Sequence, residues 1–262
     1  MAQLAVVTGA SSGIGAAYAE RLAADGWEVM AVARRRDRLE ELAARLSADH
    51  AGIVRVVEAD LGRRDDLVGL CDELAGLPVE MLVNNAGLAH YMPFVELPIG
   101  AIDELVEVDV LAPLRLTRAV LPGMQKRGSG AIINIASLLS FSGAWEAPFL
   151  PMRAVYAAAK AALVTFSQIL DTEVRAQGVR VQACCPGIVR TEFHTRQGMD
   201  MSGAPRMEPE AVVRASLHDL KDGVVVSFPG LADPRTFARV EEAMGDLMHA
   251  TRATELPERY GD

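Results

Sequence analysis

The chain reads Thr8-Gly9-Ala10-Ser11-Ser12-Gly13-Ile14-Gly15 directly after an apolar run at residues 4–7. Its glycines at 9, 13 and 15 give the spacing GxxxGxG, where the commoner dinucleotide fingerprint is GxGxxG. Glycine allows a tight turn between a strand and a helix, and it lets a pyrophosphate approach the helix N-terminus closely. The same glycines could form a plain strand-to-helix turn, but their position after the first apolar run predicts a nucleotide-binding loop.

Short apolar runs rich in Val and Ile alternate with longer amphipathic segments along the chain. The apolar runs predict strands at 4–7, 28–33, 53–58, 79–83, 131–136, 179–184 and 224–228. The amphipathic segments predict helices at 14–25, 36–48, 64–74, 101–126, 155–177 and 209–220. Such alternation implies an α/β fold, a doubly wound parallel seven-stranded sheet with helices on both faces. Ligands of these sheets bind at the carboxyl ends of the strands.

Length and composition favour one domain over residues 1–262. The chain has 262 residues, of which 50% are hydrophobic, and no repeat or low-complexity linker divides it. We expect a substrate loop at about 190–209, where Gly, Met and polar residues gather. A helical tail is expected at about 233–262, with an amphipathic helix from 234 to about 250.

Charge and cysteine content argue against several classes of protein. The formal net charge is -9, and apart from three arginines at 34–36 the basic residues are scattered, so no nucleic-acid or membrane patch is indicated. Cys71, Cys184 and Cys185 form no CxxC pattern and no disulfide framework, which fits a reducing cytoplasm. The sequence has no basic leader, no apolar run long enough to span a bilayer, and no metal-ligand spacing among its histidines. We therefore expect a cytoplasmic protein without a metal.

Tyr156 and Lys160 lie four residues apart in a predicted helix, so they present a phenol and an ammonium group on one face. A free tyrosine has a pKa of about 10, and a nearby cation lowers that pKa because it favours the phenolate. The two residues predict an acid/base pair, although Tyr and Lys at this spacing also occur on ordinary solvated helix faces.

Five motifs follow one another in order and together indicate a family. They are the Gly-rich segment at 8–15, Asn84-Asn85-Ala86-Gly87 after the fourth predicted strand, Ser137 after the fifth, Tyr156xxxLys160, and Pro186-Gly187-Ile188-Val189-Arg190-Thr191 after the sixth. From residue 3 to about 230, this set resembles the classical short-chain dehydrogenases/reductases. The resemblance implies a Rossmann-type fold, a nicotinamide cofactor and hydride transfer.

The resemblance also implies the roles of single residues. Tyr156 would donate a proton to the carbonyl, Lys160 would lower the pKa of Tyr156 and bind the nicotinamide ribose, and Ser137 would orient the substrate oxygen. Ser137 could also be an ordinary cap at a strand end. Asn84 would border the adenosine ribose. The implied cofactor contacts are Gly9, Ser11, Ser12, Gly13, Ile14, Gly15, Arg34, Arg35, Asp60, Leu61, Asn85, Ala86, Gly87, Tyr156, Lys160, Pro186, Gly187, Ile188 and Thr191.

The end of the second predicted strand indicates which nicotinamide cofactor binds. Relatives that prefer NAD carry an acidic residue there, whereas this chain has Ala33, Arg34 and Arg35. A guanidinium can hold a 2′-phosphate in a charge-assisted fork, so we expect NADP(H), with Arg34 as the main contact and Arg35 as an auxiliary. The arginines could instead begin a solvated helix. By resemblance Asp60 and Leu61 contact the adenine, although Asp60 could be only a helix cap.

The chain departs from the family pattern in two places. Asp109 stands where relatives often carry an Asn whose backbone binds a water that leads to the lysine. If the helix is distorted there, the backbone carbonyl could still hold that water, while the carboxylate would raise the pKa of Lys160 and compete for its charge. We expect Asp109→Asn to change turnover only modestly. The second departure is an insertion at about 140–153, between Ser137 and Tyr156.

The insertion carries large apolar side chains on a loop with Pro148 and Pro151, and this loop could form the wall of a substrate pocket. A packing loop or a subunit contact is the alternative, and both interpretations stay open. The apolar residues are Phe141, Trp145, Phe149, Leu150 and Met152. Phe193, His194, Met199 and Met201 in the substrate loop favour the pocket, because methionine adapts to varied apolar ligands. His90 could edge the pocket or be a surface histidine.

These observations predict an NADPH-dependent carbonyl reductase, reversible as an alcohol dehydrogenase, that acts on a largely apolar ketone or aldehyde with Tyr156 as general acid/base. The same scaffold could support imine reduction, epimerisation or dehydration, or serve as a non-catalytic nucleotide-binding regulator. Net oxidation of the cofactor separates these possibilities. We expect a homodimer or homotetramer with a small carbonyl or alcohol substrate, and neither nucleic acid nor membrane as a partner.

Overall fold

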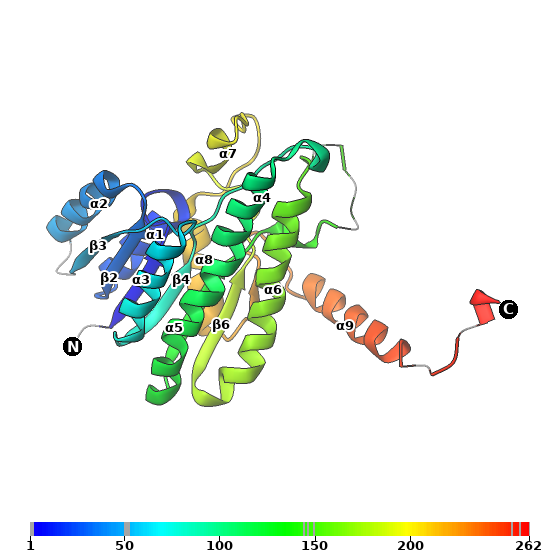
Figure 1. Cartoon of the computed structure of the whole chain (residues 1–262). Helices are drawn as coiled ribbons and strands as arrows, with labels where there is room; N and C mark the ends of the chain where they lie inside the picture. The colour runs from blue at the N-terminus through cyan, green and yellow to red at the C-terminus, as the bar shows by residue number, and fades with distance from the viewer. Residues whose placement is uncertain are drawn as a thin grey trace. The chain divides into compact units, whose positions relative to one another are not determined.

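The computed structural model describes residues 3–49, 53–143, 145, 147–148, 150–252, 254–256 and 258–261. Its strands are β1 (Leu4–Thr8), β2 (Glu28–Ala33), β3 (Val54–Glu58), β4 (Val79–Asn84), β5 (Gly130–Ile135), β6 (Val179–Cys184) and β7 (Val226–Ser227). Its α-helices are α1 (Gly13–Ala24), α2 (Arg36–Asp49), α3 (Arg64–Ala75), α4 (Ile99–Val106), α5 (Ala112–Arg127), α6 (Ala154–Val174), α7 (Glu192–Arg196), α8 (Pro209–Lys221) and α9 (Arg235–Ala250), shown in Figure 1. Short turns complete the set, namely η1 (Phe94–Glu96), η2 (Glu107–Leu111), η3 (Leu138–Phe141), η4 (Arg175–Gln177) and η5 (Glu258–Tyr260).

Within the described residues, the strands form one parallel sheet in the order β3-β2-β1-β4-β5-β6-β7. The predicted fold class is confirmed. Because β1 lies between β2 and β4, the chain crosses from one side of β1 to the other on its way from β3 to β4. Such a switch point opens a crevice beyond the carboxyl ends of the strands, where ligands of these sheets bind.

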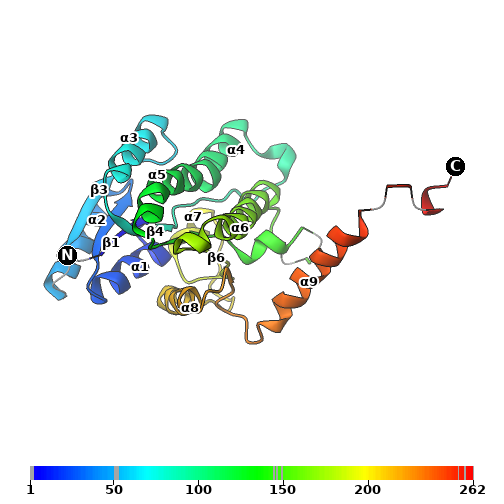
Figure 2. The ribbon, with the colours of Figure 1, turned by 90° about the horizontal axis from the view of Figure 1, so that it is seen from below.

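Each face of the sheet has its own apolar core, because successive residues of a strand point to opposite faces. On one face, Ala5 and Val7 of β1 pack with residues of α1, α2 and α8. On the other face, Leu4 and Val6 pack with residues of α3, α5 and α6. Figures 1 and 2 show these two helical layers on either side of the sheet. All of β1 is buried, as expected for the middle strand of a covered parallel sheet.

The sequence predicted one continuous helix at 101–126, and this prediction is wrong. The π-helical turn η2 separates α4 from α5. Within η2 the spacing is that of a π-helix, since the N–H of Ala112 bonds to the carbonyl of Glu107 five residues earlier. Proline supplies the reason, because Pro113 has no N–H to donate to the Asp109 carbonyl four residues before it. The distortion therefore falls at Asp109, and its side chain lies fully buried there.

The chain divides into two compact units, Met1–Pro229 and Gly230–Asp262. The first contains the sheet, and the second contains α9, close to the predicted helix at 234–250. That residues 1–262 form a single domain stays a prediction. In the described part of the chain, every helix is too short or too polar to cross a membrane. Cys71, Cys184 and Cys185 are free thiols.

Candidate active site

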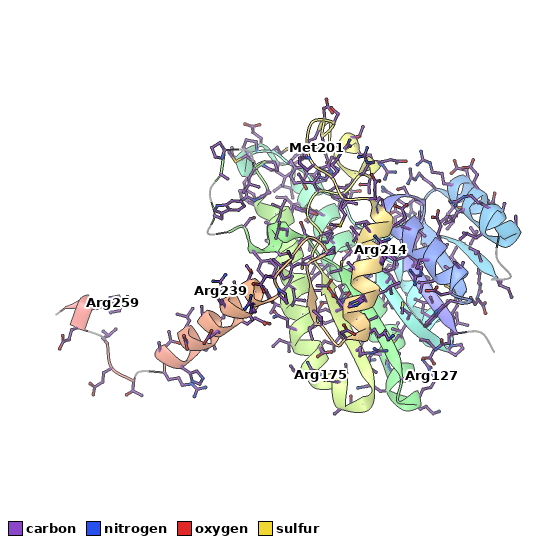
Figure 3. All side chains as sticks on the ribbon, turned by 180° about the vertical axis from the view of Figure 1, so that it is seen from behind. Arg127, Arg175, Met201, Arg214, Arg239 and Arg259 are labelled. Carbon is purple, nitrogen blue, oxygen red and sulfur yellow. The ribbon has the colours of Figure 1, made fainter. Side chains whose placement is uncertain are left out.

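A groove of about 860 Å³ opens where β1 to β6 end, and most of the predicted site residues line it. In Figure 3, Met201 of its lining lies at the opposite end of the first unit from Arg127 and Arg175. The predicted residues in its wall are Gly9, Ser11, Ser12, Gly13, Ile14, Arg34, Arg35, Asp60, Leu61, Asn85, Ala86, Gly87, Ser137, Tyr156, Lys160, Pro186, Gly187, Ile188 and Thr191. Gly15 and Asp109 lie outside the wall, and Asp109 contacts two groove residues, Lys160 and Leu88.

The Gly-rich loop is packed so tightly that a Cβ at Gly9, Gly13 or Gly15 would lie less than 3.0 Å from a neighbouring atom. Gly9 has a φ of 66°, and a Cβ there would lie 2.7 Å from Asn85 Nδ2. A Cβ on Gly15 would lie 2.4 Å from the Gly9 carbonyl oxygen. Gly15 therefore serves the packing of the loop against α1, and Gly9 brings the backbone of the loop into the groove wall.

The loop after β4 is bound directly to the Gly-rich loop through Thr8. The Thr8 hydroxyl accepts hydrogen bonds from the N–H groups of Asn85 at 2.9 Å and Ala86 at 3.0 Å. Asn85 also donates from Nδ2 to the Thr8 carbonyl at 2.9 Å. These bonds fix the two loops on either side of the switch point relative to each other.

Arg35 and Arg34 point to different parts of the groove. Arg35 donates from Nη2 to the hydroxyls of Ser11 at 2.8 Å and Ser12 at 2.9 Å, so its guanidinium lies over the Gly-rich loop. Arg34 Nη1 lies 3.7 Å from Glu104 and 3.9 Å from Asp60, and its side chain is 58% exposed against 29% for Arg35. The arginine expected to be the auxiliary is thus the one that contacts the nucleotide-binding loop.

Glu192, at the start of α7, joins the substrate loop to this arginine. Its carboxylate accepts from Arg35 at 3.1 Å and also pairs with Arg38 and Arg196. The hydrogen bond from Arg38 is the largest cause that lowers the pKa of Glu192 to about 2, and Arg196 and Arg35 add to it. The sequence reasoning missed Glu192, although its position directly after Thr191 in the last motif was a signal.

A chain of buried amides and hydroxyls holds α6, the helix of Tyr156 and Lys160, against the sheet. Asn84 Nδ2 of β4 donates to Asn134 Oδ1 of β5 at 2.8 Å, and Asn134 Nδ2 donates to the Ser167 hydroxyl of α6 at 2.9 Å. Asn84, which the resemblance placed beside the adenosine ribose, is 2% exposed and lies outside the groove wall. Its contacts assign it to the sheet and helix packing.

Lys160 and Asp109 form a buried ion pair next to the groove. Lys160 Nζ lies 3.0 Å from Asp109 Oδ2 and donates to the Ile135 carbonyl at 3.0 Å. Asp109 Oδ1 accepts from the N–H of Leu88 at 2.8 Å. Burial raises the pKa of Asp109, while the charge of Lys160 and the Leu88 N–H oppose that rise. The carboxylate thus fixes Lys160 between the strand end and the loop after β4.

Tyr156 is 6% exposed and lies in the groove wall with Ser137. Burial is the largest cause that raises the pKa of Tyr156, and the Asp109 charge raises it further, while hydrogen bonds from Ser137 and Tyr91 lower it. The expectation that Lys160 holds this pKa below its ordinary value is wrong here. Lys160 Nζ lies 5.8 Å from the centre of the Tyr156 ring and has Asp109 as its counter-charge.

Tyr91 is a groove residue that the sequence reasoning missed. Its ring meets the Tyr156 ring edge-on, with 5.5 Å between the ring centres and 72° between their planes. The sequence indicated the neighbouring His90 as a residue that could edge the pocket. His90 lies outside the groove wall, 3.9 Å from Glu104. The available signal was the position of Tyr91 shortly after the Asn84-Asn85-Ala86-Gly87 turn.

The other end of the groove is apolar. The insertion contributes Phe141, Trp145, Leu150 and Pro151, and the substrate loop contributes Phe193, His194, Met199 and Met201. Met152 is 64% exposed and outside the groove wall, and the predicted Phe149 lies outside the described residues. Arg153 closes the insertion by donating from Nε to the Ser142 hydroxyl at 2.7 Å and from Nη2 to its carbonyl at 3.0 Å.

Comparison with known proteins gives concordant matches. A family model described as short chain dehydrogenase matches residues 3–201. Very-long-chain 3-oxoacyl-CoA reductases of Anas platyrhynchos and Bos taurus are 34% and 36% identical over 81% and 74% of this chain. The matches span 67% and 61% of the lengths of those two relatives.

Two solved structures match the chain over nearly its whole length. A short-chain dehydrogenase from Sphingobium yanoikuyae in complex with NADPH has a TM-score of 0.93 at 35% identity, covering 98% of this chain and 100% of that one. A bulky-bulky ketone specific alcohol dehydrogenase from Comamonas testosteroni has a TM-score of 0.88 at 33% identity, covering 99% of each chain.

Proposed function

The chain belongs to the short-chain dehydrogenase family and is an oxidoreductase of CH–OH and C=O groups, and we propose that it reduces a largely apolar ketone or aldehyde with NADPH. The reaction runs in reverse as an alcohol oxidation. One observation carries this proposal. The Tyr156 hydroxyl, with Ser137 beside it, lies in a groove that has a nucleotide-binding loop at one end and apolar side chains at the other.

The residues of the groove fit NADP(H). Gly9 and Gly15 have no room for a Cβ, so the loop backbone can approach a pyrophosphate, and Ser12 makes no capping hydrogen bond with its side chain at the start of α1. Arg35, with Ser11 and Ser12, offers a guanidinium and two hydroxyls to a 2′-phosphate. The remaining contacts proposed are Arg34, Asp60 and Leu61 toward the adenosine, Tyr156 and Lys160 toward the nicotinamide ribose, and Ile188 and Thr191 toward the carboxamide. When bound, NADPH supplies the hydride for the carbonyl carbon.

The side chains of the protein supply the proton and the alignment. Ser137 donates a hydrogen bond to the substrate oxygen, and Tyr156 transfers its hydroxyl proton to that oxygen as negative charge develops there. Because burial keeps the pKa of Tyr156 high, the phenol is protonated and available as an acid at neutral pH. Lys160 positions the ribose while Asp109 and the Ile135 carbonyl hold its ammonium group.

The apolar end of the groove determines the substrate class. Phe141, Trp145, Leu150 and Phe193 form an aromatic and aliphatic surface that suits a ketone with bulky apolar groups. The similarity to the bulky-bulky ketone specific alcohol dehydrogenase from Comamonas testosteroni supports this class. A 3-oxoacyl thioester is the second candidate, favoured by the names of the relatives from Anas platyrhynchos and Bos taurus.

We further propose a homodimer or homotetramer located in the cytoplasm. The exposed side of α6 carries Ala158, Ala162, Thr165 and Ile169, spaced along one helix face. Three of these side chains are small, and Ile169 is 56% exposed, so a second copy of α6 could approach closely.

The test measures NADPH oxidation by absorbance against bulky ketones, aliphatic aldehydes and a 3-oxoacyl thioester, with NADH in parallel. We expect oxidation with bulky ketones, faster with NADPH than with NADH at equal low concentrations. Tyr156→Phe should lower turnover by about 10²–10⁴-fold, the usual contribution of a general acid. NADPH binding, followed by fluorescence, should stay near that of the unchanged protein.

Three outcomes contradict the proposal. Binding without oxidation over the whole panel, unaffected by Tyr156→Phe, would indicate a regulator. Product formation without net oxidation of NADPH would indicate epimerisation or dehydration. Faster oxidation of NADH would overturn the assignment of Arg35 and Arg34 to a 2′-phosphate.

A further inference from the structure

We propose that Tyr91 is a second phenol of the acid/base machinery, whose hydroxyl donates a hydrogen bond to Tyr156 Oη and stabilises the phenolate that Tyr156 becomes. The inference rests on the proposed function, since it assumes that Tyr156 gives up a proton. It extends that function to a residue outside the five sequence motifs. Tyr91 lies on the loop after β4, whereas Tyr156 lies on α6.

The two rings are held in a fixed arrangement by an apolar cluster. Tyr156, Ala89, Leu105 and Ala159 form its buried part, and Tyr91 packs against it. The ring centres are 5.5 Å apart with the planes at 72°, so the edge of one ring meets the face of the other. Tyr91 also lines the groove, so its hydroxyl and that of Tyr156 share one wall.

The direction of the hydrogen bond follows from the chemistry of the step, because a phenolate oxygen carries no proton and can only accept, so the hydroxyl of the neighbouring Tyr91 is the donor. The bond lowers the pKa of Tyr156, as expected for the group that accepts it. The same bond raises the pKa of Tyr91, after burial and the charge of Tyr156, as expected for the donor. Tyr91 therefore keeps its proton when Tyr156 ionises, and it acts as a donor to the phenolate.

The charges around Tyr156 explain why this donor matters. The carboxylate of Asp109 in η2 disfavours a phenolate at Tyr156. The nearby cation is Lys160, and Asp109 lies 3.0 Å from its Nζ as a counter-charge. The groups that favour the phenolate are therefore the hydroxyl donors, Ser137 and Tyr91. Ser137 also donates a hydrogen bond to the substrate oxygen. Tyr91 is therefore the donor that bonds to Tyr156 alone.

The proton and electron balance of the step is simple. The hydride pair from NADPH forms the new C–H bond, the C=O π pair moves to the oxygen, and that oxygen takes the proton as the Tyr156 O–H bond breaks. The pair of the broken bond stays on Tyr156 Oη as a phenolate. The Tyr91 O–H bond remains intact, and its hydrogen bond strengthens because the acceptor is now charged.

The test is Tyr91→Phe, which keeps the ring and its packing and removes only the hydroxyl. We expect kcat to fall about tenfold or more, because a hydrogen bond to a charged group is lost, with little change in the KM of a bulky ketone. In the oxidation direction, the apparent pKa of the rate profile should rise by about one unit. In a Tyr156→Phe background, the same change should have no further effect on turnover.

Tyr18→Phe is the matched control. Tyr18 of α1 is a fully buried tyrosine outside the groove wall, and its hydroxyl donates to Ser216 at 2.6 Å. Removal of the Tyr18 hydroxyl should leave the pH profile of the rate unchanged. Thermal melting of each variant reports whether it is folded.

A measurement without turnover separates this inference from the proposed function. In protein labelled with ¹³C at the tyrosine ζ carbon, Tyr91→Phe should shift the Tyr156 resonance, and Tyr18→Phe should not. An unmoved Tyr156 resonance, or a Tyr91→Phe enzyme with the kcat and rate profile of the unchanged protein, would overturn the inference. If the resonance shifts but no carbonyl is reduced, the phenol pair stands and the proposed function fails.

Discussion

Two carboxylates meet cations beside the groove, one next to Tyr156 and one next to the Gly-rich loop, and their surroundings differ. Asp109 is fully buried, with one cation, Lys160, at 3.0 Å and the N–H of Leu88 on its other oxygen. The side chain of Glu192 is 41% exposed and has three arginines, Arg35, Arg38 and Arg196.

The difference decides which end of the groove can change its contacts. Loss of one partner of a buried pair leaves a charge without compensation in the protein interior, so the contact at Asp109 is fixed. Exposed pairs contribute little net free energy and are screened by salt, so Glu192 can be replaced by another anion at small cost. The ion pair next to Tyr156 is therefore rigid, whereas the contacts of the arginines next to the Gly-rich loop can be exchanged.

The largest effect is expected where the buried pair is broken. Asp109→Leu leaves Lys160 buried without a counter-charge and should lower the free energy of unfolding by about 3–5 kcal/mol. Asp109→Asn keeps an oxygen acceptor for Leu88 and should be milder, with the modest change in turnover expected from the sequence. Urea denaturation measures both. Equal and small losses for the two variants would show that the ion pair does not hold this end together.

An intermediate effect is expected when the contacts next to the Gly-rich loop lose Arg35, their central cation. Arg35→Gln should weaken NADPH binding by about ten- to a hundredfold, the worth of a charge-assisted hydrogen bond, and leave NADH binding nearly unchanged. Arg34→Gln should have a smaller effect, because Arg34 points toward Glu104 and Asp60. Fluorescence titration with both cofactors is the measurement, and a larger loss from Arg34→Gln would restore the order expected from the sequence.

The smallest effect should follow removal of the competing carboxylate. Glu192→Gln leaves Arg35 free for a 2′-phosphate and should tighten NADPH binding by a few-fold, about what an exposed ion pair is worth. NADH binding serves as the control and should not move. Weaker NADPH binding in this variant would mean that Glu192 orients Arg35 instead of competing for it.

The same ion pairs have a defined pH window. The pKa of Glu192 is lowered to about 2 from an ordinary value of 4.5, so its pairs are complete above pH 4.5 and are lost as the pH falls toward 2. The protection factors of the amide hydrogens in α7, which correct for the slower intrinsic exchange in acid, should therefore fall over this range in the unchanged protein. In Glu192→Gln they should already be low at neutral pH.

The sequence predicted the fold and most of the groove because both depend on local patterns. Val-rich runs such as 28–33 are buried on both faces, and that burial is readable from composition. The Gly-rich loop was readable because only glycine tolerates the contacts at Gly9 and Gly15. The order of strands and helices then fixed where the motifs would meet.

The errors arose where a side chain chooses between distant partners. Arg34 and Arg35 are neighbours, and spacing alone does not indicate which guanidinium turns toward Ser11. The contact of Asp109 with Lys160 was expected, but burial and the Asp109 charge raise the pKa of Tyr156, and that burial is not readable from the spacing of Tyr156 and Lys160. Tyr91 was missed because its partner lies in a helix far along the chain.

The amide chain from Asn84 through Asn134 to Ser167 has a consequence for biosynthesis. Asn84 and Asn134 are 50 positions apart, and Ser167 lies 33 beyond Asn134. Contacts of such long sequence separation form late in folding, and nascent chains emerge from the N-terminus onward. The Gly-rich loop can therefore take shape early on the ribosome, whereas Tyr156, the proposed proton donor, is oriented only after the second half of the polypeptide has been synthesised. A prematurely terminated product would keep the Gly-rich turn and lack any means of reduction.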